Sequence, residues 1–230
     1  MKQKTEAPTT RRRNGRPRSE TTRLAILAAT TKLLETQSVR ALTMEAIAAS
    51  AKVSKATIYR WWRSKASVVI DAFVEHHLVQ TPMPRGVTSF QALKRHMQLL
   101  IQEYSKLGGR IVAQIIAEGQ SDPSILREFR ERFHYGRRAV VREVIEQGKR
   151  TGEIRSDLDS ETIMEVLYSP IYFRLLIGYL PLDDAFARRF PDVVLAMIEN
   201  QGARKKANGA SSRPKRRRSP APPAGTDTAD

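Results

Sequence analysis

The chain of 230 residues contains no cysteine. Disulfide bonds, thiolate metal sites and cysteine nucleophiles are therefore excluded, and a reducing cytoplasm is the compartment that this composition favours. No apolar run approaches the roughly 18 residues that a membrane span needs, and residues 1–10 lack the apolar segment of a secretion signal. We expect a cytoplasmic protein that has no membrane partner.

Motifs for catalysis and cofactor binding are also missing. The sequence has no glycine-rich phosphate loop and no Gly-x-Ser-x-Gly nucleophile motif. Its four histidines, His76, His77, His96 and His134, lack the spacing of metal ligands, because adjacent residues on a helix point about 100° apart. We predict no catalytic residue, no metal site and no cofactor, and therefore a protein that is not an enzyme.

Positive charge is abundant but unevenly distributed. The formal net charge is +16. Residues 1–20 carry seven Lys or Arg against two acidic residues, residues 21–80 eight against four, and residues 203–230 eight against two. Residues 81–202 are nearly neutral, with seventeen against sixteen. A polyanion such as DNA is therefore the expected partner of the first 80 residues and of the C-terminal end, and not of the middle.

Hydrophobic periodicity predicts an all-α protein. Apolar residues recur every three or four positions, and no strand alternation interrupts them. The composition divides the chain into a disordered basic arm (1–20), a small helical domain (21–66), a larger helical domain (67–201) and a disordered basic tail (202–230). Within the larger domain, Gly108 and Gly109 are expected to end the helix that precedes them.

Residues 43–65 have the pattern of a helix-turn-helix. Thr43 and Ser54 are expected to cap two short helices, with three or four residues of turn between them. Small alanines allow the two helices to approach, and apolar side chains such as Ile47 and Ile58 fill the space between them. The second helix exposes short or basic side chains that suit base edges and phosphates. The segment predicts a reader of double-stranded DNA.

This segment resembles the DNA-binding domain of the TetR family of bacterial regulators. The usual sequence pattern of the family is Thr-x-x-x-Ile-Ala-x-x-Ala-Gly-Val-Ser-x-x-Thr-x-Tyr-x-x-Phe/Trp, followed by a short polar link and Lys. The resemblance covers about residues 20–70 and departs at Lys52, which replaces the usual turn glycine. Lys52 is expected either to keep a left-handed conformation, at a cost of about 1 kcal/mol, or to relax the turn.

The resemblance implies the DNA contacts residue by residue. The predicted phosphate contacts are Thr43, Tyr59 and Lys65. The residues predicted to face the major groove are Ser54, Lys55, Ala56, Thr57 and Arg60. The basic arm resembles the N-terminal segment of many relatives, in which arginines enter the adjacent minor groove. The resemblance implies this role for Arg13 and Arg16. A bacterial regulator of this kind is expected to be associated with the nucleoid.

Three features leave two interpretations open. The basic arm either enters the minor groove or is a solvated run of charge. Trp61 and Trp62 either stack on bases or, as we favour, pack against the first and fourth helices. The basic run at residues 213–218 either adds a nonspecific DNA contact or solubilises the tail.

The segment 163–180 is apolar around its circumference, and Arg174 is the only charge between residues 166 and 180. Such a helix must be buried on two sides, and a second copy of the chain most simply covers the second side. We expect a homodimer through this helix and the last one, with Pro170 and Pro191 kinking or restarting them. The predicted interface residues are Val166, Leu167, Ile171, Leu175, Val194, Met197 and Ile198.

In the TetR family, the helical part beyond the DNA-binding domain dimerises and encloses an effector pocket. The resemblance therefore implies a helical bundle for dimerisation and ligand binding at residues 67–201, with a small apolar effector. Because pockets combine apolar walls with a few polar groups, the predicted lining residues are Met97, Tyr104, Phe133, Tyr168, Tyr172 and Phe173. In the family, the ligand separates the two DNA-binding heads from a spacing of roughly 34 Å and lowers operator affinity.

The favoured function is a dimeric repressor that binds a palindromic operator and is released by a small molecule. One alternative is a sequence-tolerant architectural DNA-binding protein, which the basic ends would suit. A second alternative is an enzyme or a metabolite carrier with a vestigial DNA-binding head, but the enzyme would need an acid–base pair that the sequence does not show.

Overall fold

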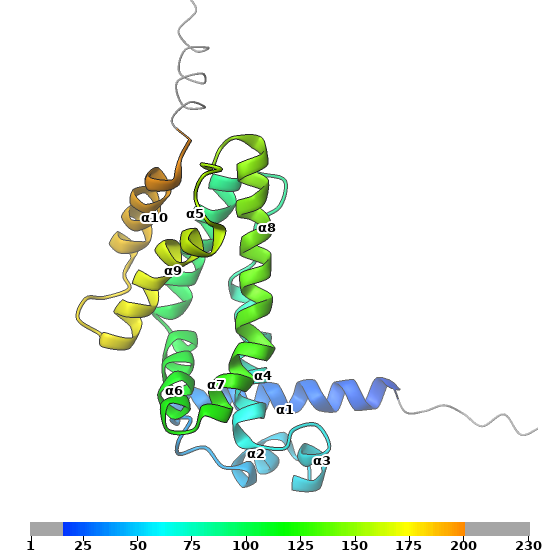
Figure 1. Cartoon of the computed structure of the whole chain (residues 1–230). Coiled ribbons are helices and arrows are strands. Elements are labelled where there is room, and N and C mark those ends of the chain that lie inside the picture. Colours follow the sequence, from blue (N-terminus) through cyan, green and yellow to red (C-terminus); the bar gives the residue numbers. More distant parts are fainter. Residues whose placement is uncertain (1–15, 201–230) are drawn as a thin grey trace, which may run out of the picture. The chain divides into compact units, whose positions relative to one another are not determined.

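The structure is a computed structural model that describes residues 16–200. Within this range every regular element is helical, and one antiparallel bridge joins Ile154 to Glu199, which confirms the all-α prediction (Figure 1). No helix in the described range has the length and apolar character of a membrane span. The elements are α1 (Arg16–Thr36), α2 (Met44–Ala51), α3 (Lys55–Tyr59), α4 (Lys65–Gln80), α5 (Ser89–Tyr104), α6 (Leu107–Ser121), α7 (Pro123–Phe129), the π-helical turn η1 (Arg130–His134), α8 (Tyr135–Thr151), α9 (Ser160–Ile177) and α10 (Asp184–Ile198).

Helix α1 begins at Arg16, inside the range that was predicted to be a disordered arm. Proline near the start of a helix is tolerated because the first N–H groups have no intrahelical partner, so Pro17 does not prevent this start. One turn later, Arg23 Nη2 lies 2.8 Å from Glu20 Oε1, a pair that supports the helix. Arg13 and the tail from residue 201 lie outside the described residues.

Side-chain caps begin the three helices that follow α1. The Ala46 amide donates to Thr43 Oγ1 at 3.1 Å, the Thr57 amide to Ser54 Oγ at 3.1 Å, and the Ser67 amide to Ser64 Oγ at 3.1 Å. Each bond satisfies a backbone donor that the first helical turn leaves free. The caps predicted at Thr43 and Ser54 are confirmed, and the three caps set where α2, α3 and α4 begin.

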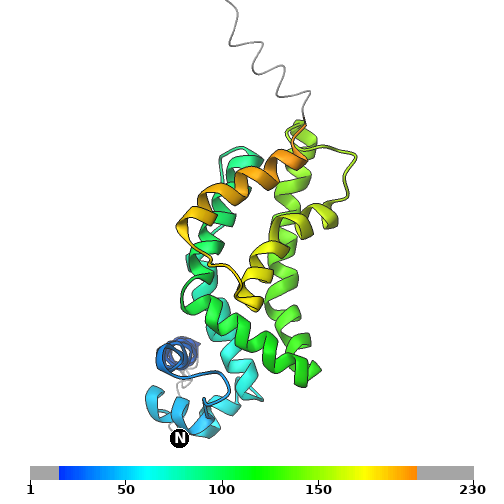
Figure 2. The same cartoon turned by 90° about the vertical axis from the view of Figure 1, so that its left-hand side faces the viewer.

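The hydrophobic core is continuous from the helix-turn-helix into the rest of the chain. Helix α4 contacts α1 on one side and α6, α7 and η1 on the other, and its Val68 and Phe73 belong to a cluster that includes both groups. A second cluster joins α5, α8, α9 and α10. The ribbons of these four helices lie together, away from α2 and α3 (Figures 1 and 2). The domain boundary predicted after residue 66 therefore falls at the start of a shared helix, and the described residues up to Glu199 group as one compact unit.

Gly108 and Gly109 lie in the first turn of α6, whereas α5 already ends at Tyr104. The prediction that Gly108 and Gly109 end the preceding helix is therefore wrong. A Cβ atom at Gly109 would lie 1.9 Å from the Tyr104 carbonyl oxygen, and one at Gly108 would lie 2.0 Å from Glu103 Oε1. The two glycines allow α6 to start close against the end of α5.

We expect Gly109→Ala to lower the free energy of unfolding by about 1–3 kcal/mol, because the backbone at the end of α5 would have to move. Gly136→Ala is the matched control, since a Cβ atom there meets nothing within 4 Å. Helix propensity predicts a gain of up to about 1 kcal/mol for the control. Urea denaturation of both variants tests this expectation, and equal stabilities would contradict it.

Helices α9 and α10 bury one side in their own chain, which corrects part of the predicted dimer interface. Both helices continue through Pro170 and Pro191, so the prolines do not restart them. Four of the predicted interface residues fill the core of the same chain, with 0–5% exposure: Leu167, Ile171, Val194 and Ile198. Leu175 is half-buried, whereas Val166 and Met197 are exposed.

The other side of this helix pair carries exposed apolar side chains. We call it the α9–α10 apolar face. Its members are Val166, Phe173, Leu176 and Ile177 in α9, Tyr179 and Leu180 in the segment between the helices, and Val193 and Met197 in α10. These include Ile177, Val193 and Met197, which are 62–63% exposed. An apolar surface shared by two adjacent helices is typical of an interaction site.

Candidate functional site

Helix α3 forms the outer part of the helix-turn-helix and lies with α2 at the lower end in Figure 1. Ser54, Lys55, Ala56 and Arg60 are exposed, and Tyr59 is 51% exposed. Thr57 is half-buried, and its hydroxyl lies 2.9 Å from the Ser54 hydroxyl. The buried Ile58 anchors the opposite side of α3 in the core. Most of the side chains predicted to face the major groove are therefore exposed on this surface.

The turn between α2 and α3 keeps the left-handed conformation at Lys52, with φ 55° and ψ 42°. Lys52 is the only described residue other than glycine that has a positive φ. Its amide donates to the Ala49 carbonyl at 3.2 Å, and the Val53 amide donates to the Ala48 carbonyl at 3.0 Å. These bonds close the end of α2 and hold the turn without glycine. The cost is of order 1 kcal/mol, and the exposed Lys52 side chain adds a cation beside α3.

Lys55 at the start of α3 is paired across the motif. Its Nζ lies 2.7 Å from Glu45 Oε1 in α2, and both side chains are more than half exposed. This bond lowers the pKa of Glu45 and raises that of Lys55. Exposed ion pairs contribute little to stability, so a phosphate or a base could replace the carboxylate. Glu45 was not predicted as part of the site, although it lies ten residues before Lys55 in the sequence.

The predicted phosphate contacts are positioned by the backbone around α2 and α4. Lys65 Nζ donates to the Arg40 carbonyl at 2.9 Å, which holds the ammonium group near the start of α2. Thr43 Oγ1 accepts the Ala46 amide, so its hydroxyl proton remains available to an acceptor. Arg40 and Arg63 are exposed on the same part of the chain. The helix-turn-helix thus presents several cations and one nearby carboxylate, Glu45.

The two tryptophans after α3 have different positions. Trp62 is 2% exposed and belongs to the core cluster, as the packing interpretation predicts, whereas Trp61 is 39% exposed. Trp62 Nε1 donates to Asp71 Oδ2 at 2.7 Å. Arg132 in η1 donates to both oxygens of the same carboxylate, at 2.9 Å and 3.0 Å. Asp71 on α4 therefore connects the end of the recognition helix with η1.

A cavity of about 60 Å³ lies between α4, α5, the η1–α8 segment and α9. Its walls combine apolar groups, including Leu100, Val141 and Met164, with aromatic and basic groups. The lining residues are His77, His96, Leu100, Tyr104, Phe133, His134, Arg137, Arg138, Val141, Met164, Tyr168 and Tyr172. A larger open groove of about 710 Å³ runs between the loop at residues 82–87 and the outer side of α8.

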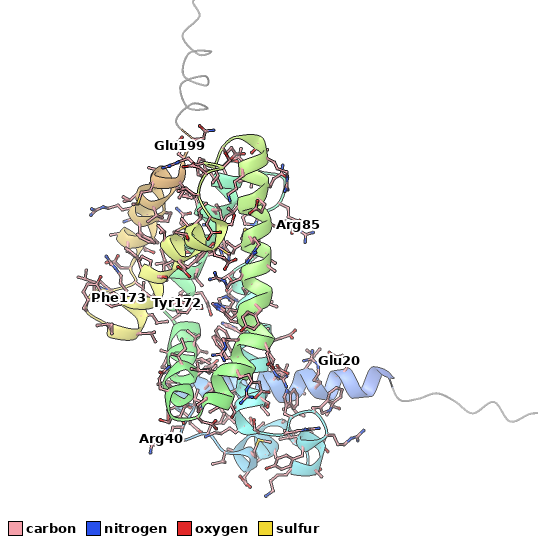
Figure 3. All side chains as sticks on the ribbon, in the orientation of Figure 1. Glu20, Arg40, Arg85, Tyr172, Phe173 and Glu199 are labelled. Carbon is pink, nitrogen blue, oxygen red and sulfur yellow. The ribbon has the colours of Figure 1, made fainter. Side chains whose placement is uncertain are left out.

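The cavity contains four of the six residues predicted to line an effector pocket. Tyr104, Phe133, Tyr168 and Tyr172 face it. Met97 does not line it, because that side chain is fully buried in the second core cluster. Phe173 is 56% exposed and points away from the interior, whereas Tyr172 points into it (Figure 3). Phe173 instead contributes to the α9–α10 apolar face.

A network of hydrogen bonds between polar side chains crosses the cavity wall. It was not predicted from the sequence. Arg137 Nη2 donates to the Thr81 carbonyl at 2.5 Å and to His96 Nε2 at 2.5 Å. Since His96 Nε2 accepts, the ring proton is on Nδ1, which donates to the Tyr168 hydroxyl oxygen at 2.8 Å. The Tyr104 and Tyr172 hydroxyls are also 2.8 Å apart. The partners in these hydrogen bonds are separated by 41–72 residues in the sequence, so no local sequence pattern predicts the bonds.

Burial sets the protonation states around the cavity. Desolvation and the charge of Arg137 lower the pKa of both His77 and His96 to about 3, so both rings are neutral near pH 7. Desolvation raises the pKa of Tyr104, Tyr168 and Tyr172, so all three keep their protons. Desolvation also lowers the pKa of Arg137. Residues 16–200 contain no group of three His, Asp or Glu side chains arranged to hold a metal ion.

The fold combines an exposed helix that follows a capped turn with a helical body that contains a cavity. This arrangement is that of a helix-turn-helix DNA-binding regulator. Two sequence profiles match the chain: "Bacterial regulatory proteins, tetR family" at residues 26–72 and "Tetracyclin repressor-like, C-terminal domain" at residues 90–194. The chain belongs to the TetR family of bacterial transcriptional regulators. It is a DNA-binding transcriptional regulator and not an enzyme.

Individual relatives agree with this family assignment. The chain is 38% identical over 176 residues to the uncharacterized HTH-type transcriptional regulator YdeS of Bacillus subtilis, covering 76% of this chain and 89% of the relative. It is 27% identical over 188 residues to the DNA-binding transcriptional repressor TetR of Mycobacteroides abscessus, covering 81% and 98%. The crystal structure of the TetR family regulator SCO0332 matches with a TM-score of 0.68 and 29% identity, covering 76% of this chain and 97% of that structure.

Proposed function

We propose that this regulator is a repressor that binds a palindromic operator as a homodimer and leaves it when a small molecule occupies the cavity. The exposed recognition surface on α3 carries this proposal, because its capped helix presents Lys55, Ala56, Tyr59 and Arg60 outward. A two-fold dimer presents two such helices, and an inverted repeat matches that symmetry. Its place of action is the nucleoid, where operator DNA is found.

The α9–α10 apolar face supports the dimer. It contains eight of the sixteen large hydrophobic side chains that are exposed in the described residues. Two-fold interfaces use the same surface on both copies, and the two adjacent helices of this face suit that arrangement. The proposed interface keeps Val166 and Met197 from the sequence prediction and adds Phe173, Ile177 and Val193.

The cavity supports release by a ligand. Phe133 and His134 line it and belong to η1, and η1 also carries Arg132, which is bound to Asp71. Asp71 in turn holds Trp62 at the end of the recognition helix. A ligand that displaces η1 would therefore act on α4 and on the position of α3. π-helical turns are frequent at functional sites, which fits this role for η1.

Selection of bound fragments from random DNA duplexes tests the proposal. Recovery of one inverted repeat with half-sites about one helical turn apart would support it. Fragments without a common sequence would support the architectural alternative, which has no support from relatives that are named as regulators.

Two variants of the helix-turn-helix are expected to change operator affinity in opposite directions. Arg60→Ala removes an exposed cation and should weaken binding by about 1–3 kcal/mol, or roughly 5- to 150-fold. Glu45→Gln removes the carboxylate that holds Lys55 and should strengthen binding, because repulsion of phosphate is lost. Fluorescence anisotropy with the selected operator measures both effects.

Arg85→Ala provides the matched control for these two variants. Arg85 is exposed but lies at the opposite end of the helical body from α2 and α3 (Figure 3). Its replacement should leave affinity unchanged at 0.15 M salt. A loss equal to that of Arg60→Ala would show that binding depends on total charge, and would contradict the proposed recognition surface.

A further inference from the structure

The cavity wall contains a cation that has no acidic partner among the described residues. Arg137 makes its hydrogen bonds through Nη2, and each accepting atom, on Thr81 or His96, is uncharged. The adjacent Arg138, by contrast, is paired with Glu161. Within residues 16–200, no Asp or Glu residue lines the cavity. A partly buried guanidinium group without a counter-ion is costly, so the site favours an anion.

The neutral groups of the cavity also offer donors in excess of acceptors. Tyr168 accepts from His96, and its own proton has no acceptor among the described residues. In the Tyr104–Tyr172 pair one hydroxyl donates to the other, which leaves one further proton unused. A ligand in this cavity would therefore have to supply acceptor atoms.

Apolar side chains form the rest of the wall. Leu100, Val141 and Met164 come from three different helices, and the Phe133 ring lies 4.9 Å from the His77 ring. A simple hydrated inorganic ion would leave these groups without a contact. Arg137 also lines the open groove beside the loop at residues 82–87, which offers a ligand an approach to the guanidinium group.

We infer that the cavity binds a small organic carboxylate, with its anionic head at Arg137 and the Tyr168 hydroxyl and its apolar body against Leu100, Phe133 and Met164. The inference rests on the proposed function only in treating this ligand as the effector. It replaces the expectation of a purely apolar effector, because the two groups at the head are a cation and a hydroxyl donor.

Matched pairs of acids and amides test the inference. Benzoate and benzamide, and butyrate and butyramide, have nearly the same size but differ in charge. Isothermal titration of the full-length protein at pH 7.5 is expected to show at least a 10-fold preference for each carboxylate over its amide. Equal affinity within a pair would overturn the inference, and so would the absence of carboxylate binding up to 10 mM. Sulfate binding as tight as that of benzoate would also overturn it, since the apolar wall would then contribute nothing.

Three variants test which residues cause the preference for a carboxylate over its amide. Arg137→Met should remove it, whereas Arg142→Met, a neutralisation on the same helix outside the cavity, should leave it unchanged. Because Arg137 also holds Thr81, its replacement could unfold the chain, and Tyr168→Phe is the second test. Tyr168→Phe should weaken carboxylate binding 3- to 10-fold and amide binding less, because the hydroxyl donates more strongly to a charged acceptor. An unaltered preference in folded Arg137→Met, or in Tyr168→Phe, would refute the assignment of the head site.

Operator binding separates this inference from the proposed function. If carboxylates bind through Arg137 but leave the operator complex intact, the anion site stands and release by a ligand fails. If amides release the operator as well as their acids do, release stands and the anion inference fails.

Discussion

Replacing Ile177 with glutamate is expected to convert the proposed dimer to a monomer and to lower operator affinity by about 100-fold or more. Ile177 is 63% exposed at the end of α9, within the α9–α10 apolar face. A two-fold interface would bury a new carboxylate from each copy without a partner, which is strongly unfavourable. A monomer contacts one half-site, so the gain from linking two heads, about 10²–10⁴ in affinity, is lost. Light scattering and operator titration measure the two effects.

Val79→Glu is the matched control for Ile177→Glu, because it introduces the same negative charge at another exposed apolar residue. Val79 is 74% exposed near the end of α4, outside the α9–α10 apolar face. This variant should remain a dimer and bind the operator as the unaltered chain does. A wild-type protein that is monomeric at micromolar concentration would refute the proposed interface, and so would an Ile177→Glu protein that remains dimeric.

Mild acid is expected to destabilise the folded chain strongly through two buried histidines. The folded chain keeps His77 and His96 neutral because burial lowers their pKa from 6.5 to about 3. The unfolded chain takes up these protons below about pH 6.5, so stability is fully present above that pH and falls as the pH decreases toward 3. The two histidines together should cost about 3–4 kcal/mol between pH 7 and pH 5.

The groups around these histidines modify but do not reverse this expectation. Arg137 stays charged and opposes protonation of both rings, and the nearby tyrosines stay neutral. Burial raises the pKa of Glu103, which contacts His76 and gives a smaller effect of opposite sign. Urea denaturation at the two pH values measures the sum of these effects.

A double variant isolates the histidines. In His77→Phe with His96→Gln, the phenyl ring can pack among the surrounding aromatic rings, and the amide can still accept from Arg137. This variant should lose much less stability than the unaltered chain between pH 7 and pH 5. Equal losses in the two proteins would assign the acid sensitivity to other groups.

The helix-turn-helix was predictable because its signals are local. Thr43 and Ser54 cap helices through amides only three residues away, and apolar periodicity shows which side of a short helix is buried. Lys52 shows the limit of this reasoning. The sequence allowed either a left-handed residue or a relaxed turn, and the structure has the left-handed conformation at φ 55°.

Local patterns did not show which side of α9 faces the rest of its own chain. Its apolar residues surround the helix, so Leu167 and Ile171 were equivalent to Phe173 and Ile177 until the packing of α5 and α10 distinguished them. Periodicity cannot orient a helix that has no polar side. Only the tertiary structure therefore separates the core side of α9 from the α9–α10 apolar face.

The DNA-binding segment could be inferred from the order of residues 43–65, because each helix start there is set by atoms within one helical turn. The cavity could be inferred only as a group of aromatic residues. Arg137, His96 and Tyr168 are brought together by α5, α8 and α9 across 41–72 residues. The neutral ring of His96 and the unpaired charge of Arg137 depend on burial that only this packing creates, so the tertiary structure alone decides what chemistry the cavity offers.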